Sequence, residues 1–453
     1  MTERLVVIGG DAAGMSAASQ ARKRRGTDDL QIAVFERGRF TSYSACGIPY
    51  WIAGVVESRD ALVAVSPEQF RERGIEVHRR REVVAIDTRA RRVEVWELDG
   101  GASRWESYDE LLIATGARPI RPSLPGLDTE GVFGVQTLGD GAAVRAFIED
   151  NAIEQAVVVG GGYIGLEMAE AMAVRGIHVH VVSRSDHVMP TLDADIAGPI
   201  ADAMRAAGIE VHLGCSVDGF EVGPDGRVAA VRTDDGHLDA DLVFLGIGAG
   251  PEIALAEEAG LPIGAARGIV TDARQHTPVD GVWAAGDCTQ TFHRVSREPV
   301  AISLGTIANK QGRVAGMNLG GDPTTFPGVL GTAITRVCDL EVARTGLSVR
   351  ECNELGQPFI EESFGSTTAA GYMPEAHDMR VKVTVAPDTH RLLGAQIVGG
   401  AGAAKRIDAF AMALWNEMTV EDLVNVDLSY APPFSGVWDA VLVAARKVVE
   451  GGR

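Results

Sequence analysis

The chain has 453 residues, of which 46% are hydrophobic and 23% charged, and its formal net charge is −20. This length predicts two or three domains, and the composition is typical of a globular protein. The negative charge argues against nucleic acid as a partner, and no apolar run approaches the length needed to cross a membrane.

The cysteines indicate a reducing compartment. Five of them, at positions 46, 215, 288, 338 and 352, are widely scattered and form no CxxC pair. Such a set fits a cytoplasmic protein better than a disulfide framework, and the chain starts in an apolar strand rather than a signal peptide. No ligand pairs occur at the spacing of zinc motifs, so we expect no metal site.

The first predicted elements form a dinucleotide-binding unit. A buried strand at residues 5–8 leads into the turn GGDAAG at residues 9–14, a helix over 13–25 and a strand over 31–35 that ends at Glu36. Glycines let the backbone approach a pyrophosphate, and the helix N-terminus favours its charge. An acid about 20 residues further on can hold ribose hydroxyls. The match is imperfect, because Asp11 replaces the middle glycine of GxGxxG.

A single cysteine follows this unit. Cys46 lies among small residues in the segment SYSACGIPY at residues 42–50, with no second cysteine within ten residues. The thiolate is the reactive form of cysteine. We expect Cys46 to lie at a helix start beside a cofactor, where its pKa is depressed well below ~8.5.

A second dinucleotide unit lies further along the chain. Strands are expected near residues 76–78, 82–87, 91–97 and 111–113, and prolines between 119 and 125 predict a crossing between domains. A strand at residue 156 then leads into GGGYIG at residues 160–165, a full GxGxxG, followed by a helix and a strand over 178–182. That strand ends at Ser183 and Arg184 instead of an acid, which suits the 2′-phosphate of NADPH.

The remainder continues this unit and then changes character. Four strands are expected between residues 210 and 245, a strand with the turn AGD near 282–287, and a helix over 301–318. From about residue 322 we expect five strands up to residue 398, and helices over 403–415 and 437–449. This last part carries no cofactor motif and indicates an α+β oligomerisation module.

Taken in order, these motifs resemble the two-dinucleotide flavoprotein disulfide reductases over nearly the whole chain. The chain is most similar to the single-cysteine branch, the coenzyme A disulfide reductases with their NADH oxidase and peroxidase relatives. Besides the two turns and the cysteine segment, the similarity rests on ATG at 114–116, AGD at 285–287, GYMP at 371–374 and SYAPP at 429–433.

The resemblance implies an α/β fold with two Rossmann-like domains and a C-terminal α+β dimerisation domain. The FAD-binding domain would comprise residues 1–118 and 246–322, the NAD(P)H-binding domain residues 119–245, and the dimerisation domain residues 323–453. The protein would be a cytoplasmic homodimeric flavoprotein that binds neither nucleic acid nor a membrane.

The resemblance also implies roles for individual residues. Cys46 would be the redox-active residue, and Tyr372 and Tyr430 would enter the partner subunit's active site. Coenzyme A would be bound by Gln20, Arg22, Lys23 and Ser42. FAD and NADPH, or NADH, would be bound by Gly9, Ala12, Gly14, Glu36, Arg37, Thr115, Gly116, Gly160, Gly162, Tyr163, Gly165, Glu167, Ser183, Arg184, Gly286 and Asp287.

Particular residues discriminate among branches of the family. Glutathione-reductase-like members carry a second cysteine five positions on, where this chain has Trp51. Peroxidases commonly carry a histidine in the first turn, where this chain has Ala12. Ser42 matches a serine of the coenzyme A disulfide reductases, whereas Ala45 departs from their frequent asparagine.

The sequence therefore predicts an FAD-dependent NAD(P)H reductase that acts on coenzyme A disulfide through a mixed disulfide with Cys46. Reduction of persulfides, polysulfides or other low-molecular-weight disulfides is the first alternative. An NAD(P)H oxidase that cycles through a Cys46 sulfenic acid is the second. A reductase for a protein partner and a non-catalytic NADPH sensor are also left open.

Overall fold

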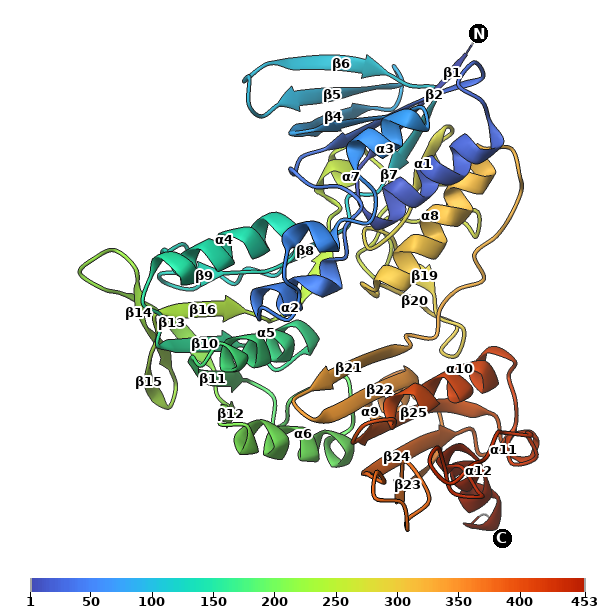
Figure 1. Ribbon diagram of the computed structural model, residues 1–453. Coiled ribbons are helices and arrows are strands. Elements are labelled where there is room, and N and C mark those ends of the chain that lie inside the picture. Colours follow the sequence, from blue (N-terminus) through green and yellow to red (C-terminus); the bar gives the residue numbers. More distant parts are fainter. Residues whose placement is uncertain (1, 452–453) are drawn as a thin grey trace.

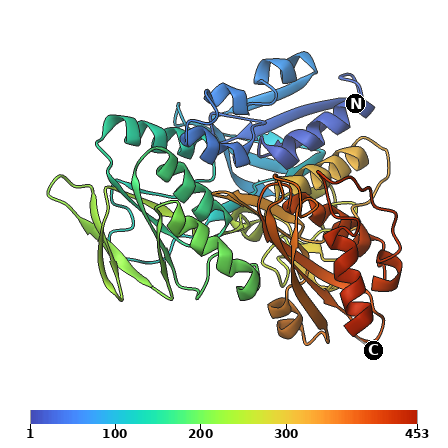
Figure 2. The same cartoon turned by 60° about the horizontal axis from the view of Figure 1, so that its bottom comes forward.

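The protein consists of three lobes, and each contains one five-stranded sheet. The computed structural model describes residues 2–451. The N-terminus lies at the first lobe and the C-terminus at the third (Figure 1). The second lobe projects to one side of the other two (Figure 2). Each of the three predicted domain ranges contains one of these five-stranded sheets. The exact residues at which the domains begin and end stay a prediction.

The first lobe contains a parallel sheet whose strands are buried on both faces. Helices α1 and α8 cover one face, and a three-stranded antiparallel sheet covers the other. The strands of the parallel sheet, in spatial order, are β18 (Val282–Ala284), β7 (Glu110–Ile113), β1 (Glu3–Ile8), β2 (Leu30–Glu36) and β3 (Ile75–Arg79). The other elements are α1 (Ala12–Arg24), α8 (Gly305–Leu319), β4 (Arg81–Asp87), β5 (Arg92–Glu97), β6 (Ser103–Ser107), α3 (Pro67–Glu72), α7 (Ala254–Glu258), β19 (Thr291–Phe292) and β20 (Pro299–Val300).

Small residues allow α1 and α8 to pack closely. A Cβ on Gly312 would lie 2.2 Å from the carbonyl oxygen of Ala13, and one on Gly316 would lie 2.2 Å from that of Ala17. These distances are far shorter than any van der Waals contact, so only glycine fits at either position. The close approach aligns the polar faces of the two helices, and Ser16 Oγ donates to Asn309 Oδ1 at 2.8 Å.

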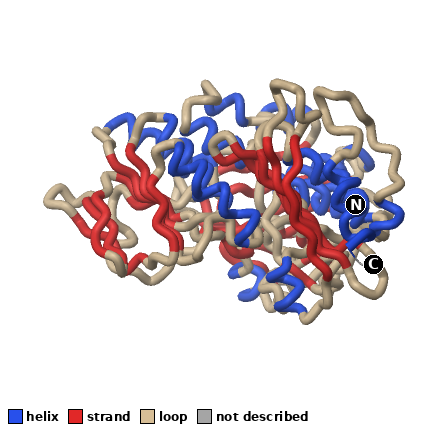
Figure 3. The backbone as a smooth tube through the Cα atoms, turned by 90° about the horizontal axis from the view of Figure 1, so that it is seen from below, coloured by secondary structure: helices blue, strands red, loops and turns tan. Residues whose placement is uncertain are grey.

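The second lobe repeats the parallel arrangement. The spatial order of its strands is β12 (Glu210–Leu213), β11 (His178–Ser183), β10 (Gln155–Val159), β16 (Leu242–Leu245) and β9 (Val132–Phe133). The other elements are α4 (Leu138–Asp150), α5 (Tyr163–Val174), α6 (Ala194–Ala206), and the antiparallel strands β13 (Val217–Val222), β14 (Val228–Thr233) and β15 (Gly236–Asp239). In Figure 3 the strands of the second lobe and the strands of the third lobe form two separate groups.

Two short strands join the first lobe to the second. The chain leaves the first lobe through β8 (Ala117–Pro119) and returns through β17 (Ala249–Pro251). The two strands pair with each other in antiparallel register, with Ala117 opposite Pro251. This pair confirms the crossing that the prolines after residue 118 predicted.

The third lobe is an antiparallel sheet packed against helices. Its strands, in spatial order, are β21 (Ala333–Val337), β22 (Leu340–Gly346), β25 (Leu392–Gly399), β24 (Asp378–Val385) and β23 (Ile360–Thr367). Its helices are α9 (Val349–Leu355), α10 (Ile407–Trp415), α11 (Val420–Leu423) and α12 (Ala440–Gly451). The predicted mixed α/β architecture is therefore confirmed.

Several elements differ from their predicted extent. The helix predicted from residue 301 begins at Gly305, because residues 301–304 form a connection between β20 and α8. The helix predicted from residue 437 begins at Ala440. Helices α4, α6 and α9 were not predicted, although α4 and α9 start with capping boxes, Thr137 with Asp140 and Ser348 with Glu351. Within residues 2–451, no helix is long and apolar enough to cross a membrane.

Candidate active site

Cys46 lies where the first two lobes meet. It belongs to a single 3₁₀ turn, Ala45–Gly47, that leads into α2 (Ile48–Ile52), so the predicted helix start is confirmed. The apolar side chains of α2 pack into the core of the second lobe beside α4 and α5. Arg175 Nη1 also donates to the carbonyl oxygen of Ile52 at 2.9 Å. The cysteine turn is thus fixed on the lobe that carries the second glycine-rich turn.

The thiol of Cys46 is exposed, and none of the five cysteines is in a disulfide. Trp51 is buried and packs beside Arg145. The groups around Cys46 raise its pKa: partial burial has the largest effect, followed by the Glu167 carboxylate. The prediction of a depressed pKa is therefore wrong for the protein groups alone, because partial burial disfavours the thiolate and the nearby Glu167 carboxylate adds to this effect.

The carboxylate of Glu167 has a testable influence on this thiol. Glu167 accepts a hydrogen bond from Thr335 Oγ1 at 2.9 Å, and a glutamine can preserve that bond. We expect Glu167→Gln to lower the pKa of Cys46, because the substitution removes a negative charge that disfavours the thiolate. The thiolate fraction, and hence the rate of alkylation by iodoacetamide, should then rise at a lower pH than in the wild type.

The measurement is the rate at which the Cys46 peptide is carboxamidomethylated, followed by mass spectrometry. The pH is varied between 6 and 10 in steps of about one pH unit, a range that brackets the ordinary thiol pKa. Glu154→Gln, which removes an exposed carboxylate from the same lobe, is the matched control. An unchanged midpoint in Glu167→Gln would show that this carboxylate does not act on the thiol.

The first turn has the features needed to hold FAD. Gly9 adopts φ +105°, and a Cβ there would lie 2.1 Å from the carbonyl oxygen of Ala114. A Cβ on Gly14 would lie 2.0 Å from the carbonyl oxygen of Gly9, so β1 and α1 approach as a dinucleotide turn requires. Asp287 Oδ1 is buried without a hydrogen-bond partner among residues 2–451, and burial raises the pKa of this carboxyl to about 6. An unpaired buried oxygen fits a ligand hydroxyl as its donor.

Other predicted FAD residues surround this turn. Glu36 accepts backbone hydrogen bonds from Gly10 at 2.7 Å and Gly38 at 2.6 Å, so it fastens the end of β2 to the turn. Arg37 is exposed beside it. Thr115 Oγ1 donates to the carbonyl oxygen of Glu252 at 2.7 Å, which secures the crossing strands. Three more of the predicted residues lie at the turns themselves, namely Ala12 at the start of α1, Gly116 at φ +74° and Gly286 at φ +87°.

The second turn has the same close strand–helix contact. Gly160 adopts φ +110°, and a Cβ on Gly165 would lie 2.1 Å from its carbonyl oxygen. Gly162 caps α5, which begins at Tyr163. Ser183 is buried at the end of β11, and its Oγ accepts from the Ser185 backbone at 3.3 Å.

Arg184, next to Ser183, is exposed and has no ion-pair partner among residues 2–451. Its guanidinium is therefore available to a phosphate, while the hydroxyl of Ser183 is partly committed to the backbone.

A basic cavity lies beside the cysteine segment. Its volume is about 530 Å³, and Tyr43 and Ser44 of that segment form part of its wall. The lining also contains three cations, Arg73, Lys310 and Arg313, which are exposed and have no ion-pair partner among residues 2–451, and one acidic residue, Asp11. Three cations against one acid, in a chain of net charge −20, indicate a site for an anionic ligand.

The predicted coenzyme A residues divide into two groups. Gln20 and Ser42 line the basic cavity. Arg22 does not, because its guanidinium donates to three backbone carbonyls, among them those of Leu30 at 2.6 Å and Gly74 at 3.0 Å. Lys23 is exposed and is also outside the lining. The residues that supply the positive charge were missed, since no local motif marks Arg73 after α3 or Lys310 and Arg313 on α8.

The two predicted tyrosines lie together on the third lobe. Tyr372 is 74% exposed and Tyr430 is 46% exposed. Their loops are joined by a hydrogen bond from the Ala370 backbone to the carbonyl oxygen of Pro432 at 2.9 Å. A hydrogen bond with Tyr372 raises the pKa of Tyr430. Phe434, 76% exposed, extends the pair into an aromatic surface, which is typical of a protein interface.

Zinc-motif spacing, from which no metal site was expected, does not cover every way in which ligands meet, because residues two apart on a strand also share one face. The sheet of the second lobe places His178, His180 and Glu210 together in an arrangement that could hold a metal ion.

Two Rossmann-like units, with an exposed cysteine between them in the sequence, are the arrangement of a dinucleotide-dependent oxidoreductase. The chain belongs to the pyridine nucleotide-disulphide oxidoreductase family, whose model matches residues 3–312, and the dimerisation domain of that family matches residues 332–441. The predicted family is confirmed, and with it a flavin-dependent enzyme that uses FAD and NAD(P)H.

Known proteins resemble the chain over its full length. It is 37% identical to the NAD(P)H coenzyme A polysulfide/persulfide reductase of Pyrococcus horikoshii, over 98% of each chain. It is 30% identical to the coenzyme A disulfide reductase of Staphylococcus aureus, over 98% of this chain and 99% of the relative. An engineered NADPH oxidase derived from the water-forming NADH oxidase of Lactobacillus brevis matches with a TM-score of 0.94 at 27% identity, over 99% of both chains.

Proposed function

We propose that the protein reduces coenzyme A disulfide with NADPH in the cytoplasm, through a single redox cysteine, Cys46. The observation that carries the proposal is the basic cavity beside the cysteine segment. Coenzyme A carries several phosphates at one end and a thiol at the other, and the cavity is lined both by cations and by residues of the cysteine segment. Uncharged or zwitterionic disulfides offer nothing to the three cations Arg73, Lys310 and Arg313.

The chain's own residues account for the thiol chemistry. The Cys46 thiolate attacks one sulfur of the disulfide, so that an S–S bond to Cys46 forms as the substrate S–S bond breaks. The first coenzyme A leaves as a thiolate and takes up a proton. Tyr430 is placed beside Tyr372 on an exposed surface, from which it could donate that proton in the partner subunit's site.

The second half of the reaction regenerates the thiolate. When bound, FAD supplies a two-electron relay between the nicotinamide and the Cys46 sulfur. The mixed disulfide takes up that electron pair, the second coenzyme A thiolate leaves and is protonated, and Cys46 is again a thiolate. One NADPH and one proton from solvent, together with one disulfide, thus yield NADP⁺ and two thiols.

Arg184 favours NADPH over NADH. In the engineered NADPH oxidase, an aspartate is changed to alanine and the next two residues to arginine and serine. A similar run, Ser183-Arg184-Ser185, follows β11 here, and Arg184 has no carboxylate partner among residues 2–451. We therefore propose that Arg184 and the adjacent serines bind the 2′-phosphate.

Replacing this arginine should change nucleotide preference alone. We expect Arg184→Ala to raise the KM for NADPH roughly 10-fold or more and to leave the KM for NADH unchanged, because a charge-assisted bond to the phosphate is lost. The measurement is steady-state kinetics with both nucleotides. Arg205→Ala, a surface change in the same lobe where the arginine pairs with Asp202, is the control. Equal KM changes for the two nucleotides would contradict the assignment.

The same cavity also suits a coenzyme A persulfide. The relative at 37% identity is named a coenzyme A polysulfide/persulfide reductase, whereas the relative at 30% identity is a coenzyme A disulfide reductase. In that second candidate, attack by Cys46 would release sulfide in place of one thiol. An oxidase is the third candidate, since the engineered relative reduces oxygen to water.

The deciding assay follows NADPH oxidation by the FAD-loaded protein under anaerobic conditions. The acceptors are coenzyme A disulfide, coenzyme A persulfide and pantethine, which has the same disulfide arm without phosphates. Turnover with coenzyme A disulfide and a much higher KM for pantethine would support the proposal. Equal use of pantethine would refute the role of the basic cavity. Turnover only with the persulfide, or only with air, would select the second or third candidate.

A further inference from the structure

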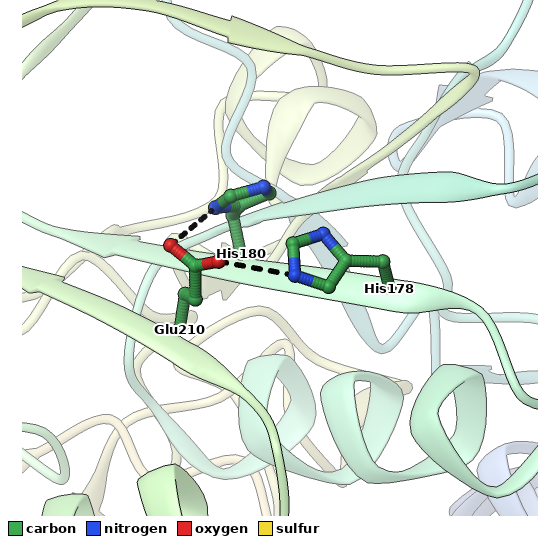
Figure 4. Close-up of side chains that lie close together, drawn as sticks. All are labelled: His178, His180 and Glu210. Atoms are coloured by element: carbon green, nitrogen blue, oxygen red, sulfur yellow. Dashed lines mark ion pairs between the residues drawn. The ribbon is translucent and has the colours of Figure 1, made fainter.

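Two neighbouring strands of the second lobe present a group of metal-binding side chains. His178 and His180 are two residues apart on β11 and so share one face of the strand, and His180 lies opposite Glu210 of β12 in the parallel register. Figure 4 shows the two imidazoles directed toward the Glu210 carboxylate between them. The group is remote in sequence from the cysteine segment and from the first glycine-rich turn, and it lies on the strand that ends at Ser183.

The separations within the group match those of metal ligands. His178 Nε2 lies 3.0 Å from Glu210 Oε1, and His180 Nδ1 lies 3.6 Å from Glu210 Oε2. One potential ligand atom from each of the three residues lies within 4.8 Å of the others. Two ligands bonded to one tetrahedral zinc ion at ~2.0–2.2 Å are about 3.4 Å apart. Small side-chain rotations therefore suffice to place all three around an ion.

The group combines one buried side chain with two accessible ones. His180 is only 8% exposed, whereas His178 and Glu210 are exposed, so an ion can reach the group from solvent. His212 lies beyond His180, with Nε2 at 3.2 Å from His180 Nδ1. Imidazole nitrogens and carboxylate oxygens are donor atoms that a divalent zinc ion takes.

We propose that His178, His180 and Glu210 bind a divalent transition metal ion, with Zn²⁺ as the best match to two imidazoles and one carboxylate. Three protein ligands leave a fourth position for water. Because β12 is the edge strand of its sheet, the ion would tie this edge to β11 and stabilise the nucleotide-binding lobe. The site lies outside the disulfide-reducing machinery and does not depend on the proposed function.

The test measures zinc binding directly, on the FAD-loaded full chain in the Cys46→Ser background so that the reactive thiol cannot take up the ion. After treatment with a chelator and its removal, calorimetric titration with ZnCl₂ should give one ion per chain at micromolar concentration. Glu210→Gln and His178→Gln should each weaken binding at least ~10-fold, since even outer-shell changes cost that much. His237→Gln, in which a surface histidine paired with Glu221 is lost, should leave it unchanged.

Two further readouts separate this site from other sources of binding. Zinc should raise the Tm of the parent protein by a few degrees and leave that of Glu210→Gln unchanged. Co²⁺ in place of zinc should give a ligand-field spectrum without the intense near-ultraviolet bands of thiolate ligation. Thiolate bands, the same affinity in Glu210→Gln, or no saturable binding at submillimolar zinc would each overturn the proposal. None of these measurements requires turnover, so their outcome does not depend on whether the protein reduces a disulfide.

Discussion

Replacing Cys46 by serine should abolish disulfide reduction while FAD stays bound. A serine hydroxyl cannot form the mixed disulfide, so the rate should fall by on the order of three decades or more, the scale of nucleophile deletions in covalent catalysis. FAD should be retained because the first turn and Asp287, which hold the cofactor in the proposal, are untouched. The measurement is anaerobic NADPH oxidation with coenzyme A disulfide, normalised to flavin content by absorbance.

A matched change controls for the loss of a thiol. Cys338 is half-buried in the turn between β21 and β22, and only its backbone N–H contacts a charged group, Glu170, at 3.0 Å. Cys338→Ser should therefore keep wild-type turnover. Full disulfide-reductase turnover in Cys46→Ser would refute the single-cysteine mechanism, whereas loss of flavin in that variant would point to a structural role for the cysteine.

The second large effect concerns Tyr430. We expect Tyr430→Phe to lower turnover roughly 100-fold, because the departing thiolate loses a positioned proton donor while the aromatic ring is preserved. In the proposed homodimer this tyrosine serves the partner subunit's cysteine. Mixed dimers that combine one Cys46→Ser protomer with one Tyr430→Phe protomer, purified through two different affinity tags, test that arrangement.

The mixed dimer distinguishes the two geometries. If Tyr430 acts across the interface, one site of the mixed dimer has both an intact cysteine and an intact tyrosine, and activity recovers to about half that of the wild type, one site in two. If it acts within its own chain, both sites are defective and the mixed dimer remains as inactive as its parents. Unchanged activity in the Tyr430→Phe homodimer would remove the tyrosine from the mechanism altogether.

Local patterns predicted the parts of the fold that depend on short-range chemistry. The two glycine-rich turns, the strands around them and the proline crossing follow from backbone sterics and buried apolar runs, and all were found where expected. Helix α6 was missed because Gly198 and Pro199 interrupt it, and both are unfavourable in a helix interior. Its buried face against the neighbouring lobe stabilises it in spite of them.

The candidate site was harder to predict, since it depends on contacts between distant segments. Arg73 follows α3 and Lys310 lies on α8, more than 200 residues further along the chain, yet both line one cavity. The family resemblance assigned Arg22 to coenzyme A, but the carbonyls of Leu30 and Gly74 take up its donors. Charge along the sequence does not reveal which cations are already bonded. The histidine group was missed for a similar reason, because strand pairing creates it.

Because β8 and β17 pair with each other, the nucleotide-binding lobe is an insertion in the first lobe whose two ends lie side by side. The segment between them enters and leaves at adjacent positions, so the first lobe needs only a short link to close the gap if that segment is removed. A homologous segment with a different nucleotide preference could be spliced in at the same two points without disturbing the flavin side. Exchange of whole lobes, rather than single substitutions, is thus a route by which such enzymes could change their electron donor.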